Sequence, residues 1–316
     1  VMVPSTVPPR ATVQVVGTCV TRRPACRRPA EGSPEATLAA RKATRATATI
    51  VFDLLIVSTR PGLGSLFWHR LGVTMRWWTL PLARLIPAMA TRLGIAYHDV
   101  FLLHGTADHI ESPARLRAIV RRLEETDWMP RALRAPVEAA SREELEWLHD
   151  PSYVDEVRLV SQQGGGYLDL DTVATSETYR AACLAAGTSI QAVREVMSGR
   201  LDVVFCLVRP PGHHALPGRG MGFCFFNNAA LAAEAAVRGG LERVAIVDWD
   251  LHHGNSTQEM FYHRGDVLYF SVHQAYRTGG RGLFYPGTGT VDEVGVDAGY
   301  AKNINVPLPG GATGQD

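Results

Sequence analysis

Five side chains capable of acid–base or metal chemistry lie within eight positions, directly after the apolar run Val244–Val247: Asp248, Asp250, His252, His253 and Asn255. Side chains alternate along an extended segment, so Asp250 and His252 point the same way, with Asp248 one step behind them. A carboxylate beside an imidazole at a strand end supplies two of the three protein ligands of a catalytic zinc site. The alternative is a strand that runs into a polar loop and caps the next helix. That alternative explains one such residue better than it explains five.

A second pair of histidines follows another apolar run, Asp202–Val208, in the segment Arg209-Pro-Pro-Gly-His-His-Ala215. The Pro-Pro-Gly turn is rigid and fixes where His213 and His214 point. Adjacent imidazoles suit proton transfer because histidine titrates near neutral pH. By motif logic their orienting partners are Asp248 and Asn255. An aspartate raises the basicity of its histidine and an amide only orients it, so the pair can hold two roles. The alternative is a histidine pair that caps a loop.

Two loops combine glycines with aromatic residues, at 220–228 (Gly-Met-Gly-Phe-Cys-Phe-Phe-Asn-Asn) and at 283–289 (Leu-Phe-Tyr-Pro-Gly-Thr-Gly). The apolar residues of the first loop could line a narrow channel, although core packing is the favoured interpretation for Phe225 and Phe226. Asn227 and Asn228 are expected to cap the next helix. The Gly-Thr-Gly of the second loop does not lie between a strand and a helix, which argues against a dinucleotide site.

Alternating strands and helices must position these residues. We expect strands at 93–98, 202–208, 244–248 and 267–272, and helices at 113–125, 143–148, 178–198, 228–238 and 256–262. Such alternation predicts βαβ units and an α/β fold with a parallel sheet. Ligands of open α/β sheets bind at the carboxyl ends of the strands, where both histidine pairs lie.

Composition places the chain among globular proteins: of 316 residues, 46% are hydrophobic and 20% charged. Its five cysteines form no CxxC pair, which predicts a reducing compartment, hence a cytoplasmic location, and argues against a cysteine zinc site: Cys19, Cys26, Cys183, Cys206 and Cys224. No apolar run reaches membrane-spanning length, and no clear secretory signal opens the chain, so no membrane contact is expected.

Charge divides the chain unevenly. Residues 1–90 hold 12 Lys+Arg and 3 Asp+Glu, whereas the rest holds 20 and 28. We expect residues 1–46, rich in Arg, Pro and Ala, to be disordered. We expect an apolar segment of unknown role at 47–90, which could form either a strand and a short helix or an interfacial patch. The catalytic domain is expected at 91–316.

Four motifs taken together resemble the zinc-dependent histone deacetylase family: RPPGHHA, GFCFFNN, DWDLHHGN and FYPGTG, with HIESPARL and HDPSYV as weaker matches. The resemblance covers about 92–316 and is closest to the class II-like branch, which includes acetylpolyamine amidohydrolases. Asn255, where other members have Asp, gives the match its class II-like character. It implies the three-layer arginase/deacetylase fold around a central parallel sheet, and a zinc ion in a tube that admits an acylated amine.

The resemblance also implies roles for individual residues. The tandem histidines would be catalytic with their two partners, His214 being the general base: His213, His214, Asp248 and Asn255. Zinc would be held by Asp250 and His252. Substrate would meet Asp171 at the rim and a tunnel lined by Gly222, Phe223 and Tyr285, and Arg115 would lie in the interior beneath the site. A monovalent cation, K⁺, is expected near Asp248, Asp250, His252, Ser271 and Val272.

The implied reaction is hydrolysis of an acetyl amide, in acetyl-lysine proteins or acetylpolyamines, to acetate and a free amine. The family's third zinc ligand, its catalytic Tyr and the last strands of its sheet lie beyond Asp316. We therefore expect an incomplete deacetylase or, alternatively, an inactive fragment that at most binds acyl-lysine. A di-metal ureohydrolase is disfavoured because the RPPGHH and GFCFFNN loops do not suit a binuclear site. No direct nucleic-acid binding is expected of the catalytic domain.

Overall fold

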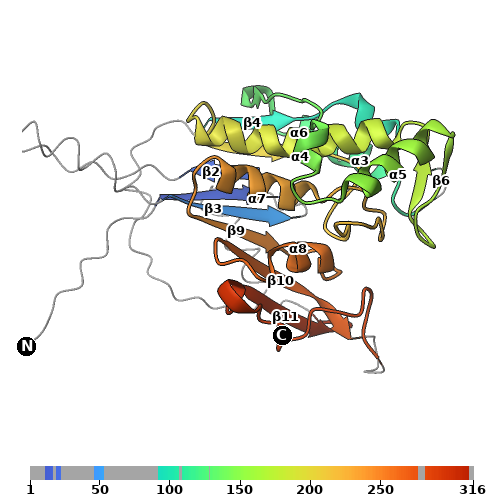
Figure 1. Cartoon of the computed structure of the whole chain (residues 1–316). Helices are drawn as coiled ribbons and strands as arrows, with labels where there is room; N and C mark the ends of the chain where they lie inside the picture. Colours follow the sequence, from blue (N-terminus) through green and yellow to red (C-terminus); the bar gives the residue numbers. More distant parts are fainter. Residues whose placement is uncertain are drawn as a thin grey trace, which may run out of the picture.

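A computed structural model describes the backbone and side chains of residues 92–106, 109–127, 129–276 and 282–312, and the backbone of three further strands. Its central feature is a nine-stranded sheet (Figure 1). The strands run across the sheet in the order β11 (Asn303–Pro309), β10 (Val267–Tyr276), β9 (Arg243–Asp248), β3 (Ala46–Phe52), β1 (Ala11–Val16), β2 (Cys19–Arg22), β8 (Val203–Cys206), β4 (Leu93–Ala96) and β5 (Leu133–Arg134). Neighbouring strands are parallel, except that β2 is antiparallel to both β1 and β8.

The helices and short segments connect these strands. They are α3 (Pro113–Glu124), α4 (Arg142–Leu145), α5 (Pro151–Gln162), α6 (Thr178–Met197), α7 (Asn228–Arg238) and α8 (Asn255–Phe261), with 3₁₀ turns η2 (Asp99–Leu102), η3 (Met129–Arg131) and η4 (Asp297–Gly299). A separate hairpin pairs β6 (Gly165–Tyr167) with β7 (Val173–Thr175). The predicted helices at 113–125, 178–198, 228–238 and 256–262 are confirmed to within one residue at each end.

Helix α5, the β6–β7 hairpin and strands β5 and β11 were not predicted. Helix α5 begins with Pro151 at its first position and Asp150 at its N-cap, an arrangement that also reads as a turn in the sequence. The three glycines at 164–166 lead into the hairpin, and Gly165 is the first residue of β6. Burial of α5 against α6 and the hairpin compensates for its weak local pattern.

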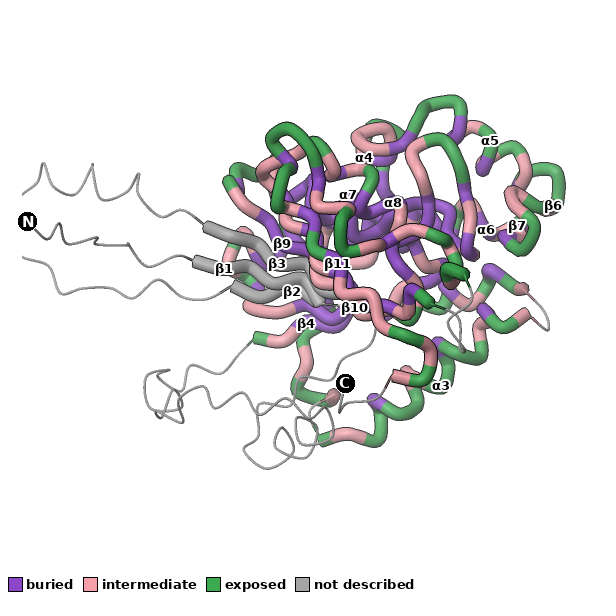
Figure 2. The backbone as a smooth tube through the Cα atoms, turned by 90° about the horizontal axis from the view of Figure 1, so that it is seen from below, coloured by how far each residue is buried: buried purple, intermediate pink, exposed green. Residues whose placement is uncertain are grey.

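Strand β8 shows why the sheet is covered on both faces. Val204 and Cys206 pack among the alanines of α6 and α7, whereas Phe205 packs on the other face with Leu116 and Leu123 of α3. Successive side chains of a strand point to opposite faces, so a strand that is apolar throughout needs a layer on each side. Figure 2 shows α3 on one side of the sheet and α7 and α8 on the other. The predicted three-layer α/β fold is confirmed.

The first 90 residues contribute strands as well. We predicted disorder for residues 1–46, but β1 and β2 lie there, within the sheet. Their β-branched residues suit strands. Strand β2 pairs with β8, β3 pairs with β9, and β1 lies between β2 and β3. The strand expected in 47–90 has its counterpart in β3. The division of the chain into three segments stays a prediction.

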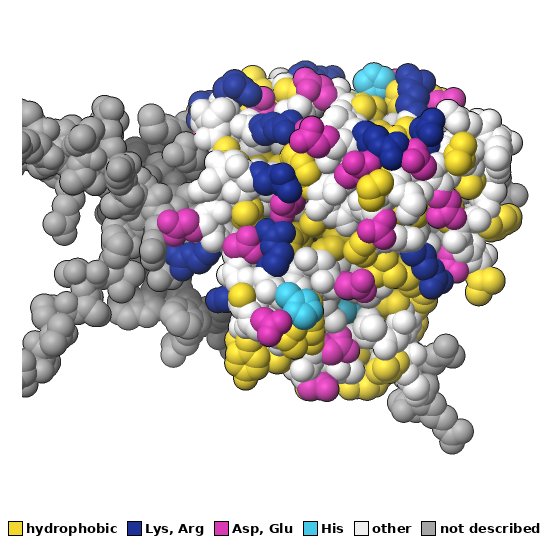
Figure 3. All heavy atoms as spheres, viewed as in Figure 1, with side chains coloured by type: hydrophobic (Ala, Val, Ile, Leu, Met, Phe, Trp, Pro, Cys, Tyr) yellow, Lys and Arg dark blue, Asp and Glu magenta, His cyan; other side chains and the backbone are white. Residues whose placement is uncertain are grey.

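Surface charge and helix length give two further observations. On the face drawn in Figure 3, basic and acidic side chains are interspersed, as in the ion pairs Arg142–Asp155 and Arg194–Glu144. Within the described residues, no helix is long and apolar enough to cross a membrane.

Candidate active site

The two histidine segments meet because loops after β8 and β9 reach toward each other. The loop after β8 is held on the start of α7, where Asn228 Nδ2 donates to the carbonyl of Pro210 at 3.1 Å. Gly212 lies so close that a Cβ there would come within 2.6 Å of the Asn228 nitrogen. The hydroxyl of Ser256, on α8, donates to the carbonyl of Ala215. The loop that carries His213 and His214 is therefore fixed on both sides.

Each tandem histidine has a different partner. His213 Nδ1 donates to Asp248 Oδ2 at 3.0 Å, and His214 Nδ1 donates to Asn255 Oδ1 at 2.7 Å. The two imidazoles lie with their centroids 4.0 Å apart. The structure thus brings together the residues that the motifs paired. One imidazole faces a carboxylate and the other a neutral amide, so the two have different electrostatic environments.

Burial keeps His214 neutral. Loss of hydration, together with the neighbouring His213, holds the pKa of His214 well below its ordinary value, and the hydrogen bond to Asn255 opposes this only in part. Because Nδ1 donates to the amide oxygen, the lone pair of His214 is on Nε2. His214 is therefore arranged to accept a proton through Nε2.

Asp248 is the centre of the buried polar cluster behind the histidines. Its Oδ2 accepts from Tyr269 Oη at 3.0 Å as well as from His213, and its Oδ1 accepts from the backbone of Asp250 at 3.1 Å. Tyr269 was not predicted, since its place in an apolar strand carries no chemical signal. The cluster leaves Asp248 with a donor on each oxygen, which holds the carboxylate rigid.

Asp250 and His252 fit two positions of a zinc site. His252 Nδ1 lies 3.2 Å from Asp250 Oδ1. Two ligand atoms on one tetrahedral zinc ion, each about 2.0–2.2 Å from it, would lie about 3.3 Å apart. The His252 ring stacks on Phe284, with centroids 5.2 Å apart and planes 9° apart, which fixes its orientation. Among the described residues, no group of three His, Cys, Asp or Glu side chains could hold a metal.

A glycine and two aromatic residues lie next to His214. The backbone of Gly222 has φ +56°, and a Cβ there would come within 2.4 Å of His214 Cδ2 and 3.0 Å of Tyr285 Oη. The Tyr285 ring meets His214 edge-on at 5.2 Å. Phe223, with φ +69°, meets His109 at 4.6 Å. Gly222 and Tyr285 thus lie beside His214, Phe223 follows Gly222 in the chain, and their role in lining a substrate tunnel stays a prediction.

The β6–β7 hairpin forms the rim beside these residues. Thr172 Oγ1 accepts from the backbone of Phe223 at 3.2 Å, which ties the hairpin to them. Asp171 is exposed, and it adds to the effect of burial in raising the pKa of the Tyr285 hydroxyl, which stays protonated. On the same rim, Arg219 pairs with Asp169 at 3.2 Å.

The residues expected to hold a monovalent cation are close neighbours. Ser271 is opposite Asp248 in the register of β9 and β10, and it is fully buried. Its hydroxyl forms a hydrogen bond with His273 Nδ1 at 2.8 Å. Val272 follows Ser271 in the chain, and Asp250 and His252 follow Asp248. The cation site itself stays a prediction.

The expectation for Arg115 is wrong. Its side chain is 59% exposed on α3, whereas that of Arg209 is 4% exposed and pairs with Glu111. Arg115 lies on the solvent side of an amphipathic helix, a position that a motif match does not reveal. The buried arginine directly precedes the Pro-Pro-Gly turn, and that placement was the only indication in the sequence.

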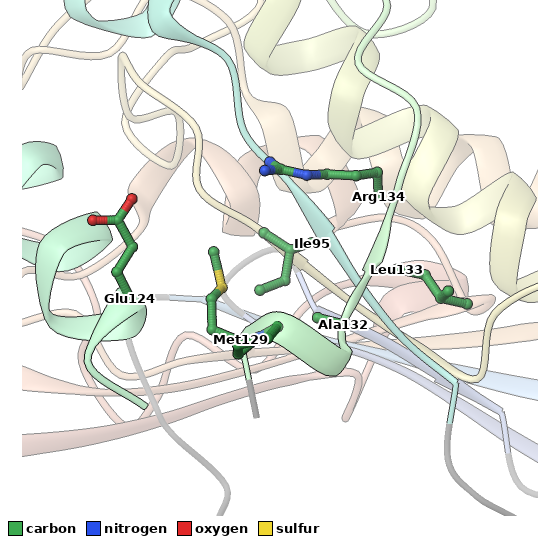
Figure 4. A pocket seen from close by; sticks show the side chains of 7 residues that line it. Ile95, Glu124, Met129, Ala132, Leu133 and Arg134 are labelled. Atoms are coloured by element: carbon green, nitrogen blue, oxygen red, sulfur yellow. The ribbon is translucent and has the colours of Figure 1, made fainter. Parts of the chain in front are cut away.

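A hollow at the β4–β5 edge is separate from this site. It is lined by Ile95, Glu124, Met129, Pro130, Ala132, Leu133 and Arg134 (Figure 4). Its lining includes one carboxylate and one guanidinium but no histidine or cysteine. It therefore offers no equivalent of the chemistry at the tandem histidines.

Comparisons with known proteins show which family the chain is similar to. Residues 109–316 match the model of the histone deacetylase domain. The histone deacetylase-like amidohydrolase of Pseudomonas aeruginosa is 43% identical over 207 residues, which cover 65% of this chain and 53% of that protein. Histone deacetylase 15 of Arabidopsis thaliana is 42% identical over 226 residues, covering 70% and 40%. A crystal structure of the HDA15 HD domain superposes with a TM-score of 0.65 at 42% identity, covering 69% of this chain and 62% of that one. The chain spans about half the length of the curated relatives it matches.

Proposed function

The chain belongs to the histone deacetylase family, and on that premise we propose that it hydrolyses acetyl or other acyl amides to a carboxylate and a free amine. The observation that supports this best is the pair of buried imidazoles with unlike partners, His213 on a carboxylate and His214 on an amide. Amide hydrolysis needs a proton to be taken from water and returned to the amine, and a buried imidazole held in one tautomer beside a second imidazole can provide both transfers.

We propose that Zn²⁺ binds between Asp250 and His252, whose donor atoms have a spacing suited to it. When bound, zinc polarises the amide carbonyl and lowers the pKa of a coordinated water. K⁺ would bind near Asp248, Asp250, His252, Ser271 and Val272, among which Ser271 lies opposite Asp248 in the register of β9 and β10.

The protein's own residues would then move the protons. His214 Nε2 takes a proton from the attacking water as the new C–O bond forms. The imidazolium is unfavourable in this buried position, because burial lowers the pKa of His214. The proton therefore passes readily to the amine nitrogen as the C–N bond breaks. Asn255 keeps the His214 ring in the required tautomer, and Asp248 orients His213 beside it.

The substrate would enter past Phe223 and Tyr285. Aromatic walls next to a glycine suit a chain of methylenes that ends in an acyl amide, such as acetyl-lysine in a protein or an acetylpolyamine. Asp171 at the rim can accept from a peptide N–H or an ammonium group. We propose a cytoplasmic location, because the five cysteines of the sequence form no CxxC pair.

Acetate release from an acetyl-lysine peptide and from an acetylpolyamine tests the proposal, with added zinc and with a chelator. We expect chelator-sensitive turnover that is lost in His214→Ala and kept in His263→Ala, which alters an exposed histidine paired with Asp297. Turnover that survives in His214→Ala contradicts the proposed role of that residue. The second candidate function is binding of acyl-lysine without hydrolysis. Absence of turnover, with acetyl-dependent binding that Phe223→Ala abolishes, would favour it.

A further inference from the structure

Arg209 and Glu111 form a buried ion pair that the proposed reaction does not use. Their side chains are 4% and 2% exposed. The pair is bidentate, with Arg209 Nε 2.6 Å from Glu111 Oε1 and Nη2 2.8 Å from Oε2. The two residues lie 98 positions apart, so the pair joins the segment before α3 to the end of β8.

Every N–H of the Arg209 guanidinium has an acceptor. Besides Glu111, Nη1 donates to the carbonyls of Phe101 at 3.0 Å and His104 at 2.6 Å, and Nη2 donates to Thr106 Oγ1 at 3.2 Å. A planar fork with five fixed donors specifies one orientation, which neither lysine nor an apolar side chain can do. The arrangement therefore fixes the orientation of the Arg209 guanidinium as well as the position of its charge.

The pair lies at the start of the loop that carries the tandem histidines. Only Pro210, Pro211 and Gly212 separate Arg209 from His213, and the φ angles of the two prolines are locked. A displacement of Arg209 is therefore transmitted to the histidines and is not absorbed by the turn. The loop is also held by Asn228 on Pro210, directly after Arg209, and by Ser256 on Ala215, beyond the histidines.

Stability alone does not account for such a pair. A buried ion pair is often no more stabilising than apolar residues of similar volume, because two charges must be taken out of water. We propose that Arg209 and Glu111 are positioning residues: they hold the start of the loop so that His213 reaches Asp248 and His214 reaches Asn255. The inference rests on the proposed function of the two histidines.

The test measures the histidine hydrogen bonds directly, in the full chain, and needs neither metal nor turnover. Nitrogen-15 NMR of the imidazole rings follows the Nδ1–H protons of His213 and His214, and thermal unfolding is measured in parallel. Three variants are compared: Glu111→Gln, Arg209→Lys, and the double variant Arg209→Met with Glu111→Leu. The control is Glu234→Gln, which breaks the ion pair with Arg264 in a different part of the protein.

We expect Glu111→Gln to lower the unfolding midpoint and the double variant to restore it. In both, the two ring N–H signals should shift and exchange with solvent at least about tenfold faster. The control should lower the midpoint without moving either signal. A double variant with a restored midpoint and parental ring signals would overturn the proposal and leave the pair a purely structural one.

Arg209→Lys decides the question if the double variant does not fold. It keeps the charge opposite Glu111 but not the five-donor fork, so the ring signals should still move. Parental signals in that variant would also overturn the proposal. A chain that shows the expected ring shifts but no acetate release in any form would count against the proposed function while leaving the positioning role in place.

Discussion

Gly254→Ala should disrupt the His213–Asp248 hydrogen bond through a single added methyl group. Gly254 has φ −77°, which alanine tolerates, so backbone strain plays no part. A Cβ at this position would lie 2.5 Å from Asp248 Oδ2, 2.5 Å from Tyr269 Oη and 3.1 Å from His213 Nδ1. It would therefore enter the space where these three polar atoms meet.

The magnitude follows from these distances. Cβ contacts under 3.0 Å essentially never occur, so each oxygen must move about 0.5 Å or the backbone must shift. Asp248 and Tyr269 are both 1% exposed and have no free space in which to move. Overpacking costs about 1–3 kcal/mol, and weakening a buried hydrogen bond to a charged group costs about 1.5–3 kcal/mol. The movement that relieves the overpacking also weakens the hydrogen bond, so the two costs overlap. We expect the free energy of unfolding to fall by about 2–4 kcal/mol in total.

Thermal unfolding and ring NMR measure both consequences. The midpoint should fall by about 4–16 °C, and the His213 Nδ1–H signal should move while that of His214 moves less. Gly105→Ala is the matched control, since Gly105 is exposed and a Cβ there meets nothing closer than 3.6 Å. If Gly254→Ala has the unfolding midpoint of the parent chain and an unchanged His213 Nδ1–H signal, the packing around Asp248 is looser than these contacts require. The predicted clash would then be refuted.

Three further predictions concern charge and metal. Asn255→Asp places a carboxylate on His214 Nδ1, so the pKa of His214 should rise and any acid limit of activity should move to higher pH; an unchanged NMR titration of His214 would contradict this. Burial lowers the pKa of His149 to about 4 and that of His104 to about 3. Below about pH 6.5 the unfolded chain then binds more protons than the folded one. As the pH falls, each of these histidines should therefore lower the free energy of unfolding by up to about 1.4 kcal/mol per pH unit. Denaturation midpoints that do not change between about pH 6.5 and 5 would count against this prediction. His252→Ala should weaken zinc binding in equilibrium dialysis at least about tenfold, and an unaltered affinity would place the metal elsewhere.

The sequence was sufficient for the fold class and for the pairing of the tandem histidines with Asp248 and Asn255. Strands such as Val244–Val247 are apolar without interruption, and the helices between them show regular apolar spacing, so an α/β fold with a parallel sheet could be predicted. The three layers were implied by the family resemblance. Strand β9 ends at Asp248, and the backbone bends at 251–252, so Asp250 and His252 do not lie on the extended segment that was expected. The bend brings His252 N–H to Asp250 Oδ1 at 2.7 Å and places their side-chain atoms 3.2 Å apart. These features depend on neighbours within a few residues, and local backbone geometry fixes them.

Only the tertiary structure decided which arginine is buried and what surrounds Asp248. Arg209 and Glu111 are 98 residues apart, and Tyr269 meets Asp248 from 21 residues away. The placement of β1 and β2 in the sheet and the formation of α5 likewise depend on partners distant in the chain. Burial and hydrogen bonding of a side chain depend on which segments pack against it, and no local pattern of residue types carries that information. The sequence therefore determined which residues gather at the ends of the strands, and the packing decided how each is held there.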